Sequence, residues 1–140
     1  MNQEYTISTD KTKLNLEVIH RFLSEEAYWC LNIPLDIVQR SIENSLCFGV
    51  YQGSEQVGFA RMITDCATFG YLADVFILPE HRGQGLSKKL VAFIMGYPQL
   101  QGLRRMMLVT RDAHGLYEQF GFQTIDMPEN TMSIKAFTAY

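Results

Sequence analysis

A short glycine-rich segment between a predicted strand and a predicted helix constrains the fold of this chain more than any other feature. It occupies residues 79–85 and contains Gly83 and Gly85. The run before it, residues 68–78, predicts a strand, and residues 86–95 after it predict a helix. Residues 106–110 predict a further strand. Strand, helix and strand in this order predict a parallel, right-handed β-α-β unit, so at least one helix must cross the face of a sheet.

The other predicted elements fit one domain, residues 1–140, since 140 residues is an ordinary length for a single domain. Strands are predicted over residues 5–8, 46–51, 57–64, 68–78, 106–110, 122–125 and 132–136, and helices over residues 15–26, 34–44, 86–95 and 113–120. Asn15 and Asp112 are the expected caps of the first and last helices. The last two strands are expected to form a closing hairpin. The order predicts an α+β fold with a mixed, mostly antiparallel sheet and helices on both faces.

Composition excludes several classes of protein. Hydrophobic residues make up 47% and charged residues 19% of the chain, values typical of a globular domain. Lys and Arg number 12 against 15 Asp and Glu, a net charge of −3, which disfavours nucleic acid as a partner. Cys30, Cys47 and Cys66 form no CxxC pair, so neither a disulfide framework nor a metal site is expected. No signal peptide or membrane-spanning stretch is found, and a cytoplasmic location is expected.

The glycine-rich segment also predicts an anion-binding site. Backbone N–H groups at the start of a helix lack helical partners, and the helix dipole makes that end partly positive. Arg82 precedes the glycines, and Lys88 and Lys89 follow them. A Walker A sequence is absent, and Lys88 occupies the third glycine position of a dinucleotide fingerprint. The alternative is a tight turn with solvated lysines.

Two motifs then resemble those of the GNAT superfamily of N-acyltransferases. Residues 82–87, Arg-Gly-Gln-Gly-Leu-Ser, resemble the family's [Q/R]-x-x-G-x-[G/A] acyl-CoA signature, with Ser87 where Gly or Ala is usual. Residues 113–122 resemble its A-x-x-L-Y-x-x-x-G-F signature, which includes Tyr117. Thr110 stands where many members have Asn. The order and spacing of the two motifs extend the resemblance over nearly the whole chain.

The resemblance implies that acetyl-CoA is the co-substrate, and it implies no metal. Backbone amides of the glycine turn are expected to hold the pyrophosphate, and the strand before it is expected to pair with the pantetheine arm. The implied cofactor contacts are Val75, Phe76, Ile77, Arg82, Gly83, Gln84, Gly85, Leu86, Ser87 and Thr110.

The resemblance also implies direct attack of an amine on the thioester, with two catalytic residues. Tyr117 matches the tyrosine that protonates the departing thiolate, and packing is its alternative role. Asp74 lies in an apolar strand, where a carboxylate is costly without a task or a partner. It is the candidate base, and a hydrogen bond to a neighbouring turn is its alternative role.

Four further residues are expected at the acceptor site: Tyr28, Trp29, Arg61 and Tyr71. Aromatic rings and a carboxylate suit an ammonium group, whereas Arg61 suits the carboxylate of an amino-acid-like acceptor. The sequence does not choose between them. A small-molecule amine is the expected acceptor, with a peptide or protein amine, or a non-catalytic CoA-binding regulatory module, as alternatives. A homodimer is expected from family tendency and from the predicted edge at residues 132–136.

Overall fold

One five-stranded sheet forms the centre of the computed structural model, which describes residues 4–140. Its strands lie in chain order: β1 (Tyr5–Ser8), β2 (Leu46–Gln52), β3 (Glu55–Thr64), β4 (Phe69–Ile77) and β5 (Arg105–Leu108). Neighbouring strands from β1 to β4 are antiparallel, and β5 is parallel to β4. The β-α-β unit predicted from the glycine-rich segment is therefore present.

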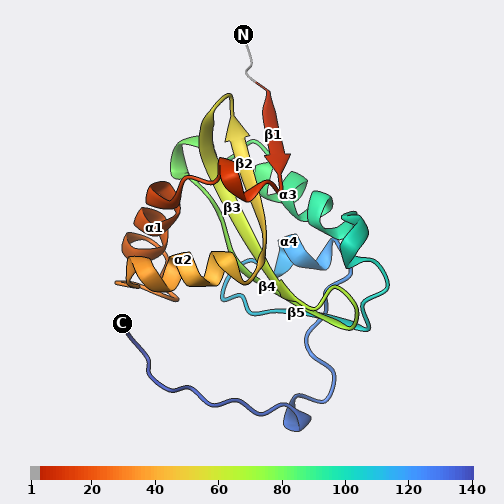
Figure 1. Ribbon diagram of the computed structural model, residues 1–140. Helices are drawn as coiled ribbons and strands as arrows, with labels where there is room; N and C mark the ends of the chain where they lie inside the picture. The colour runs from red at the N-terminus through yellow and green to blue at the C-terminus, as the bar shows by residue number, and fades with distance from the viewer. Residues whose placement is uncertain (1–3) are drawn as a thin grey trace.

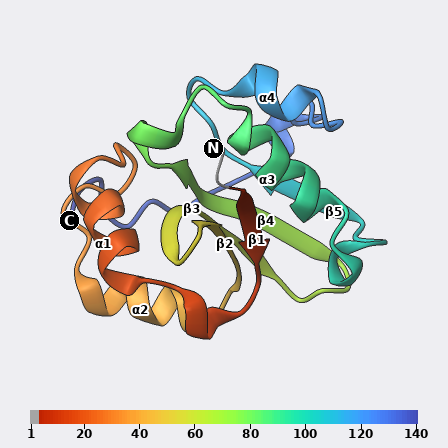
Figure 2. The same ribbon diagram turned by 90° about the horizontal axis from the view of Figure 1, so that it is seen from above.

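Helices cover both faces of this sheet (Figures 1 and 2). Helices α1 (Leu16–Glu25) and α2 (Leu35–Glu43) lie on one face, and α3 (Leu86–Met95) and α4 (His114–Glu118) lie on the other. Successive strand residues point to opposite faces and so enter two separate cores. Cys47 packs with α1 and α2, and the next residue, Phe48, packs with α3. The predicted α+β class is confirmed.

The ends of two helices follow from local sequence. Asn15 is the N-cap of α1, and its side-chain oxygen accepts a hydrogen bond from the amide of Val18 at 3.2 Å, as predicted. Helix α4 ends at Glu118, and the chain turns away at Gly121, whose φ of 95° is in the region that favours glycine. The amide of Phe122 then donates to the carbonyl of Tyr117 at 3.3 Å. This turn brings the Phe122 ring edge-on against the Tyr117 ring, 5.9 Å between centroids.

The predicted cap of α4 is wrong. The amide of Ala113 donates to the hydroxyl of Thr110 at 3.0 Å, and Asp112 makes no cap. Thr110 lies three residues before Ala113, and in this turn that spacing lets its hydroxyl reach the Ala113 amide. The helix is also shorter than the predicted residues 113–120.

The predicted closing hairpin is wrong as well. Residues 122–125 and 132–136 form no strand, and only a short 3-10 turn, Pro128–Asn130, interrupts the terminal segment. Figure 1 shows this segment leaving the body of the protein beyond α4. Residues 132–136 alternate apolar and polar side chains, but a strand also needs a neighbour for its backbone groups, and no segment within residues 4–140 pairs with this one.

The turn between β3 and β4 lies at one end of the sheet. Asp65 accepts hydrogen bonds from the amides of Ala67 and Thr68 and from the Thr68 hydroxyl. These bonds, above all that of the Thr68 side chain, lower the pKa of Asp65 well below its usual range. None of the helices within residues 4–140 is long and apolar enough to span a membrane.

Candidate active site

The glycine-rich segment forms a hollow of about 200 Å³ at the start of α3. Gly83 and Gly85 have φ values of 80° and 77°, and no atom lies within 4 Å of where a Cβ would stand at either position. Gly85 offers no side-chain cap, and no acidic residue occupies the first turn of α3. The free amides of that turn therefore form a partly positive end that no nearby negative charge neutralises. The hollow is lined by Ile77, Arg82, Gly83, Gly85, Leu86 and Ser87.

A gap between β4 and β5 continues from this hollow. The two strands pair only from Phe69 with Arg105 to Leu72 with Leu108, whereas β4 runs on to Ile77 beside β3. The side of β4 that faces β5 therefore has no paired strand beyond Leu72.

The backbone groups that face this gap follow from the pairing of β4 with β3. The amide of Leu78 donates to the carbonyl of Val57 at 2.8 Å, so Leu78 is directed toward β3. In an antiparallel ladder the backbone groups of successive residues alternate in direction. The groups of Ile77 and Val75 therefore face the gap, and those of Phe76 face β3. The guanidinium of Arg82 donates to the Ile77 carbonyl at 2.8 Å, which ties the glycine turn to this edge.

Asp74 lies at an irregular point of β4. It is one of four residues other than glycine with positive φ within the described chain, and its φ is 54°. The pairing of β3 with β4 shifts register at the same place, between Phe59 and Arg61. A bulge re-aims side chains, and residues in such a conformation gather at functional sites.

Both carboxylate oxygens of Asp74 have partners. The indole N–H of Trp29 donates to Oδ1 at 2.9 Å, and the Nε of Arg61 donates to Oδ2 at 2.8 Å. Arg61 also donates to the hydroxyl of Ser45 at 3.1 Å. The structure therefore brings together three predicted site residues, and it joins Arg61 to Asp74 rather than leaving either side chain free.

Tyr28 extends this cluster toward the last helix. Its ring lies edge-on to the ring of Trp29, 5.0 Å between centroids. The guanidinium carbon of Arg111 lies 3.7 Å from the centre of the Tyr28 ring, a cation–π geometry. Arg111 belongs to the loop between β5 and α4, and sequence reasoning missed it. The one sequence feature that could have indicated Arg111 is its position directly after Thr110, a predicted site residue.

Tyr117 lies on α4, where its ring packs into the core that covers the sheet. Burial raises the pKa of Tyr117 above its usual value of about 10, and the neighbouring phenol of Tyr28 raises it further. A phenol with a raised pKa keeps its proton at neutral pH and can donate it.

Some predicted residues lie outside this arrangement. The Phe76 ring stacks on the Phe22 ring at 4.1 Å between centroids, inside the core with α1. Tyr71 lies on β4 opposite Ile63 and Met107, and no hydrogen bond or ring contact within residues 4–140 joins it to the cluster. Gln84 donates to the Tyr5 hydroxyl at 3.2 Å, so its side chain points toward β1.

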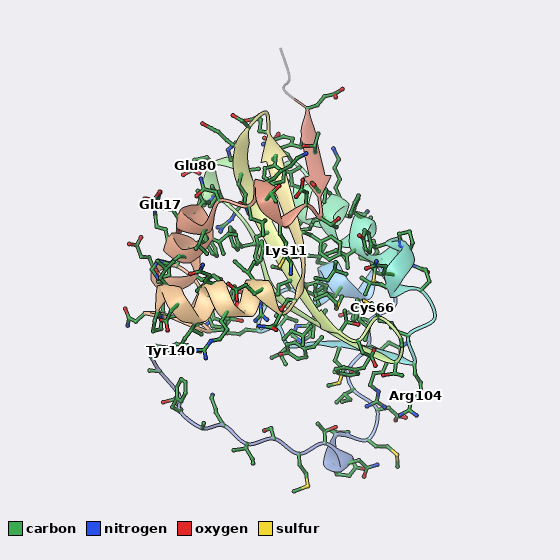
Figure 3. All side chains as sticks on the ribbon, viewed as in Figure 1. Lys11, Glu17, Cys66, Glu80, Arg104 and Tyr140 are labelled. Atoms are coloured by element: carbon green, nitrogen blue, oxygen red, sulfur yellow. The ribbon has the colours of Figure 1, made fainter. Side chains whose placement is uncertain are left out.

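The cysteines do not supply a nucleophile to this site. Burial raises the pKa of Cys30 to about 12 and that of Cys47 to about 11. A thiol with such a pKa stays protonated and unreactive at neutral pH. Cys66 is exposed in the turn between β3 and β4. Figure 3 shows it on the opposite side of the molecule from Glu17, which belongs to α1.

Comparison with known proteins assigns this geometry to a family. Residues 16–122 match the model of the Acetyltransferase (GNAT) family. A protein of Gibberella zeae named as an acetyltransferase is 36% identical, over 81% of this chain and 76% of its own length.

Solved structures agree. A GNAT-family acetyltransferase structure from Xanthomonas campestris is 50% identical and superposes with a TM-score of 0.93, covering 95% of this chain and 94% of that one. An acetyltransferase from Clostridium acetobutylicum, solved with acetyl-CoA, has a TM-score of 0.71 over 94% of this chain and 95% of its own. At 16% identity this last likeness concerns the fold alone.

Proposed function

Because the chain belongs to the GNAT acetyltransferase family, we propose that it moves an acetyl group from acetyl-CoA to the amine of a small molecule. The observation that carries the proposal is the continuity of two features. The hollow at the start of α3 opens onto the same edge of β4 that β5 leaves unpaired. One extended ligand with a diphosphate at one end fits both.

The residues of the hollow suit the diphosphate of CoA. The first-turn amides of α3 and the remaining N–H groups of Arg82 supply donors to an anion. Along the gap, the amides of Val75 and Ile77 and the carbonyl of Val75 are available to an extended arm in the manner of an added strand, while the Ile77 carbonyl accepts from Arg82. Phe76 is left out, since its ring lies in the core and its backbone faces β3.

Thr110 is assigned a smaller role in binding acetyl-CoA. Its hydroxyl oxygen already accepts the bond from the Ala113 amide, which leaves its proton and one lone pair for a ligand.

Acetyl-CoA supplies a thioester whose carbonyl carbon is attacked by the acceptor amine, so that a C–N bond forms and the C–S bond breaks. Tyr117 donates its phenolic proton to the departing sulfur. The amide of Val75, which faces the gap, donates a hydrogen bond to the carbonyl oxygen as charge develops there. The amine reacts as the free base, its nitrogen then loses one proton to water, and the Tyr117 phenolate regains a proton from solvent.

An acceptor-dependent release of CoA tests this function. The protein is incubated with acetyl-CoA and a panel of polyamines, amino acids, amino sugars and short peptides, and free thiol is measured. We expect release with one class of small amine. Acetylation of peptides alone would favour the protein-modifying alternative. Tight binding of acetyl-CoA without release in any reaction would favour the regulatory module. The Tyr117 phenol, whose pKa burial raises, is a proton donor that a module without catalysis would not need, and it favours catalysis.

Asp74 is proposed as a positioning residue, because both its oxygens already accept hydrogen bonds. Replacing Asp74 with Asn keeps its volume and leaves Arg61 without a carboxylate. We expect kcat to fall roughly tenfold, by the same factor at every pH. A pH–rate profile of the variant against the wild type measures this. Recovery of the variant's rate at high pH, where the free amine is abundant, would instead identify Asp74 as the base.

We further propose that two copies of the chain associate through the terminal segment. The hairpin that motivated this expectation is absent, but Met132 and Ile134 are 93% and 97% exposed, and β5 is an edge strand. Alternating apolar residues in an extended segment suit pairing with the β5 edge of a second copy.

Sedimentation at micromolar concentration should show a species of twice 16.1 kDa. Removal of residues 131–140 should give a monomer that binds acetyl-CoA as before, because the hollow at α3 lies outside the deleted segment. A full-length chain that sediments as a single 16.1 kDa species would rule the association out.

A further inference from the structure

The acceptor side of the site holds one arginine whose charge is balanced and one whose charge is not. Arg61 forms an ion pair with Asp74, the only ion pair within residues 4–140. Arg111 therefore has no carboxylate partner among the described residues. An arginine that already forms an ion pair binds a substrate anion poorly, whereas in an unpaired arginine all the N–H donors of the guanidinium are free to bind one.

A cation–π contact holds the Arg111 side chain. Its guanidinium carbon lies 3.7 Å from the centre of the Tyr28 ring, and no hydrogen bond within the described chain uses its N–H groups. A cation–π contact uses none of the N–H donors of the guanidinium, and these donors bind a carboxylate in bidentate fashion. The side chain is thus held in place without consuming its binding capacity.

Tyr28 connects this arginine to the proposed reaction centre. Its ring lies against the guanidinium of Arg111 and edge-on to the Trp29 ring, whose indole N–H donates to Asp74 at 2.9 Å. Arg111 lies in the loop that leads into α4, the helix that carries Tyr117. This placement on the acceptor side suits an amine and an anionic group on the same small molecule.

We propose that Arg111 binds a carboxylate of the acceptor, and that the acceptor is an amino-acid-like molecule with an amine and a carboxylate close together. The proposal rests on the proposed function and adds its substrate class. It also transfers to Arg111 the role that sequence considerations offered to Arg61.

The first experiment compares each free amino acid with its carboxamide, which keeps the amine and removes the negative charge. For the wild-type protein with acetyl-CoA, we expect kcat/KM to be about 10–100-fold higher for the acids. Higher ionic strength should reduce the difference, because Arg111 is exposed. Equal or better turnover of the amides would overturn the proposal.

The second experiment compares variants of Arg111. Arg111→Gln should raise KM for the acids about 10–100-fold with little change in kcat, and leave the amides unaffected. Arg111→Lys should retain part of the preference as a point charge. Arg104→Gln is the matched control. Arg104 is also exposed, and its amide bonds to Thr68 at the far end of β4, away from α1 (Figure 3). An Arg111→Gln protein whose KM rises for acetyl-CoA alone would place Arg111 on the cofactor and contradict the proposal.

Binding measured without turnover separates this proposal from the proposed function. NMR line broadening of an equimolar mixture of amino acids and amino-acid amides, added to the whole chain, reports acceptor binding directly. Preferential broadening of the acids that is lost in Arg111→Gln supports the carboxylate site even if no acetyl transfer is seen, in which case only the proposed function fails. Acetyl transfer without any preference for acids in binding would overturn the carboxylate site alone.

Discussion

Replacing Tyr117 with Phe should lower kcat for acetyl transfer by about 10²–10⁴-fold, the usual effect of removing a positioned general acid. The phenol is proposed to protonate the departing sulfur, and phenylalanine keeps the ring that packs against Phe122 while removing the donor. The affinity for acetyl-CoA should barely change, because the proton matters mainly as the C–S bond breaks. Single-turnover kinetics combined with calorimetry separates the two quantities.

Tyr97→Phe is the control for this variant. It also removes one hydroxyl, which bonds to Thr9 at 3.3 Å, but it lies just beyond the end of α3 and outside the cluster around Asp74. Its rate should match that of the wild type. Unaltered turnover of Tyr117→Phe, with chemistry shown to be rate-limiting, would mean that Tyr117 is structural.

Replacing Gly85 with Glu should weaken acetyl-CoA binding by at least about 100-fold. A carboxylate introduced into the hollow repels the diphosphate, and two like charges 4 Å apart near a protein surface interact by about 4 kcal/mol. The variant should still fold, because no atom lies within 4 Å of the new Cβ. The φ of 77° adds a strain of about 1 kcal/mol. Calorimetry with acetyl-CoA measures the loss.

Gly53→Glu provides the matched control. Gly53 also has a positive φ, 61°, with no atom within 4 Å, but it lies in the turn between β2 and β3. The control therefore carries similar backbone strain and the same added charge, and should bind acetyl-CoA normally. If folded Gly85→Glu binds as tightly as Gly53→Glu, the diphosphate does not bind at the glycine turn.

Local sequence signals predicted much of the fold. The cap at Asn15, the helix Leu86–Met95 and the period of the sheet strands depend on neighbouring residues, and each appears where it was expected. The C-terminal hairpin could not be settled in this way. Alternation specifies which faces residues 132–136 would present, but the existence of a strand depends on a partner edge elsewhere in space.

The candidate site was predictable only in part, for the same reason. The glycine turn is a local feature of the sequence. The bond between Trp29 and Asp74, by contrast, joins residues 45 positions apart, and the stacking of Arg111 on Tyr28 crosses most of the chain. Asp74 was noticed because a carboxylate in an apolar strand needs a partner, yet only the structure identifies Arg61 and Trp29 as those partners.

A crystal structure of the chain with acetyl-CoA tests the central claim most directly. We expect the diphosphate against the amides of the first turn of α3, the pantetheine arm along β4 beside Val75 and Ile77, and the thioester sulfur within about 3.5 Å of the Tyr117 hydroxyl. A diphosphate bound away from the hollow, or a sulfur beyond the reach of Tyr117, would contradict the account.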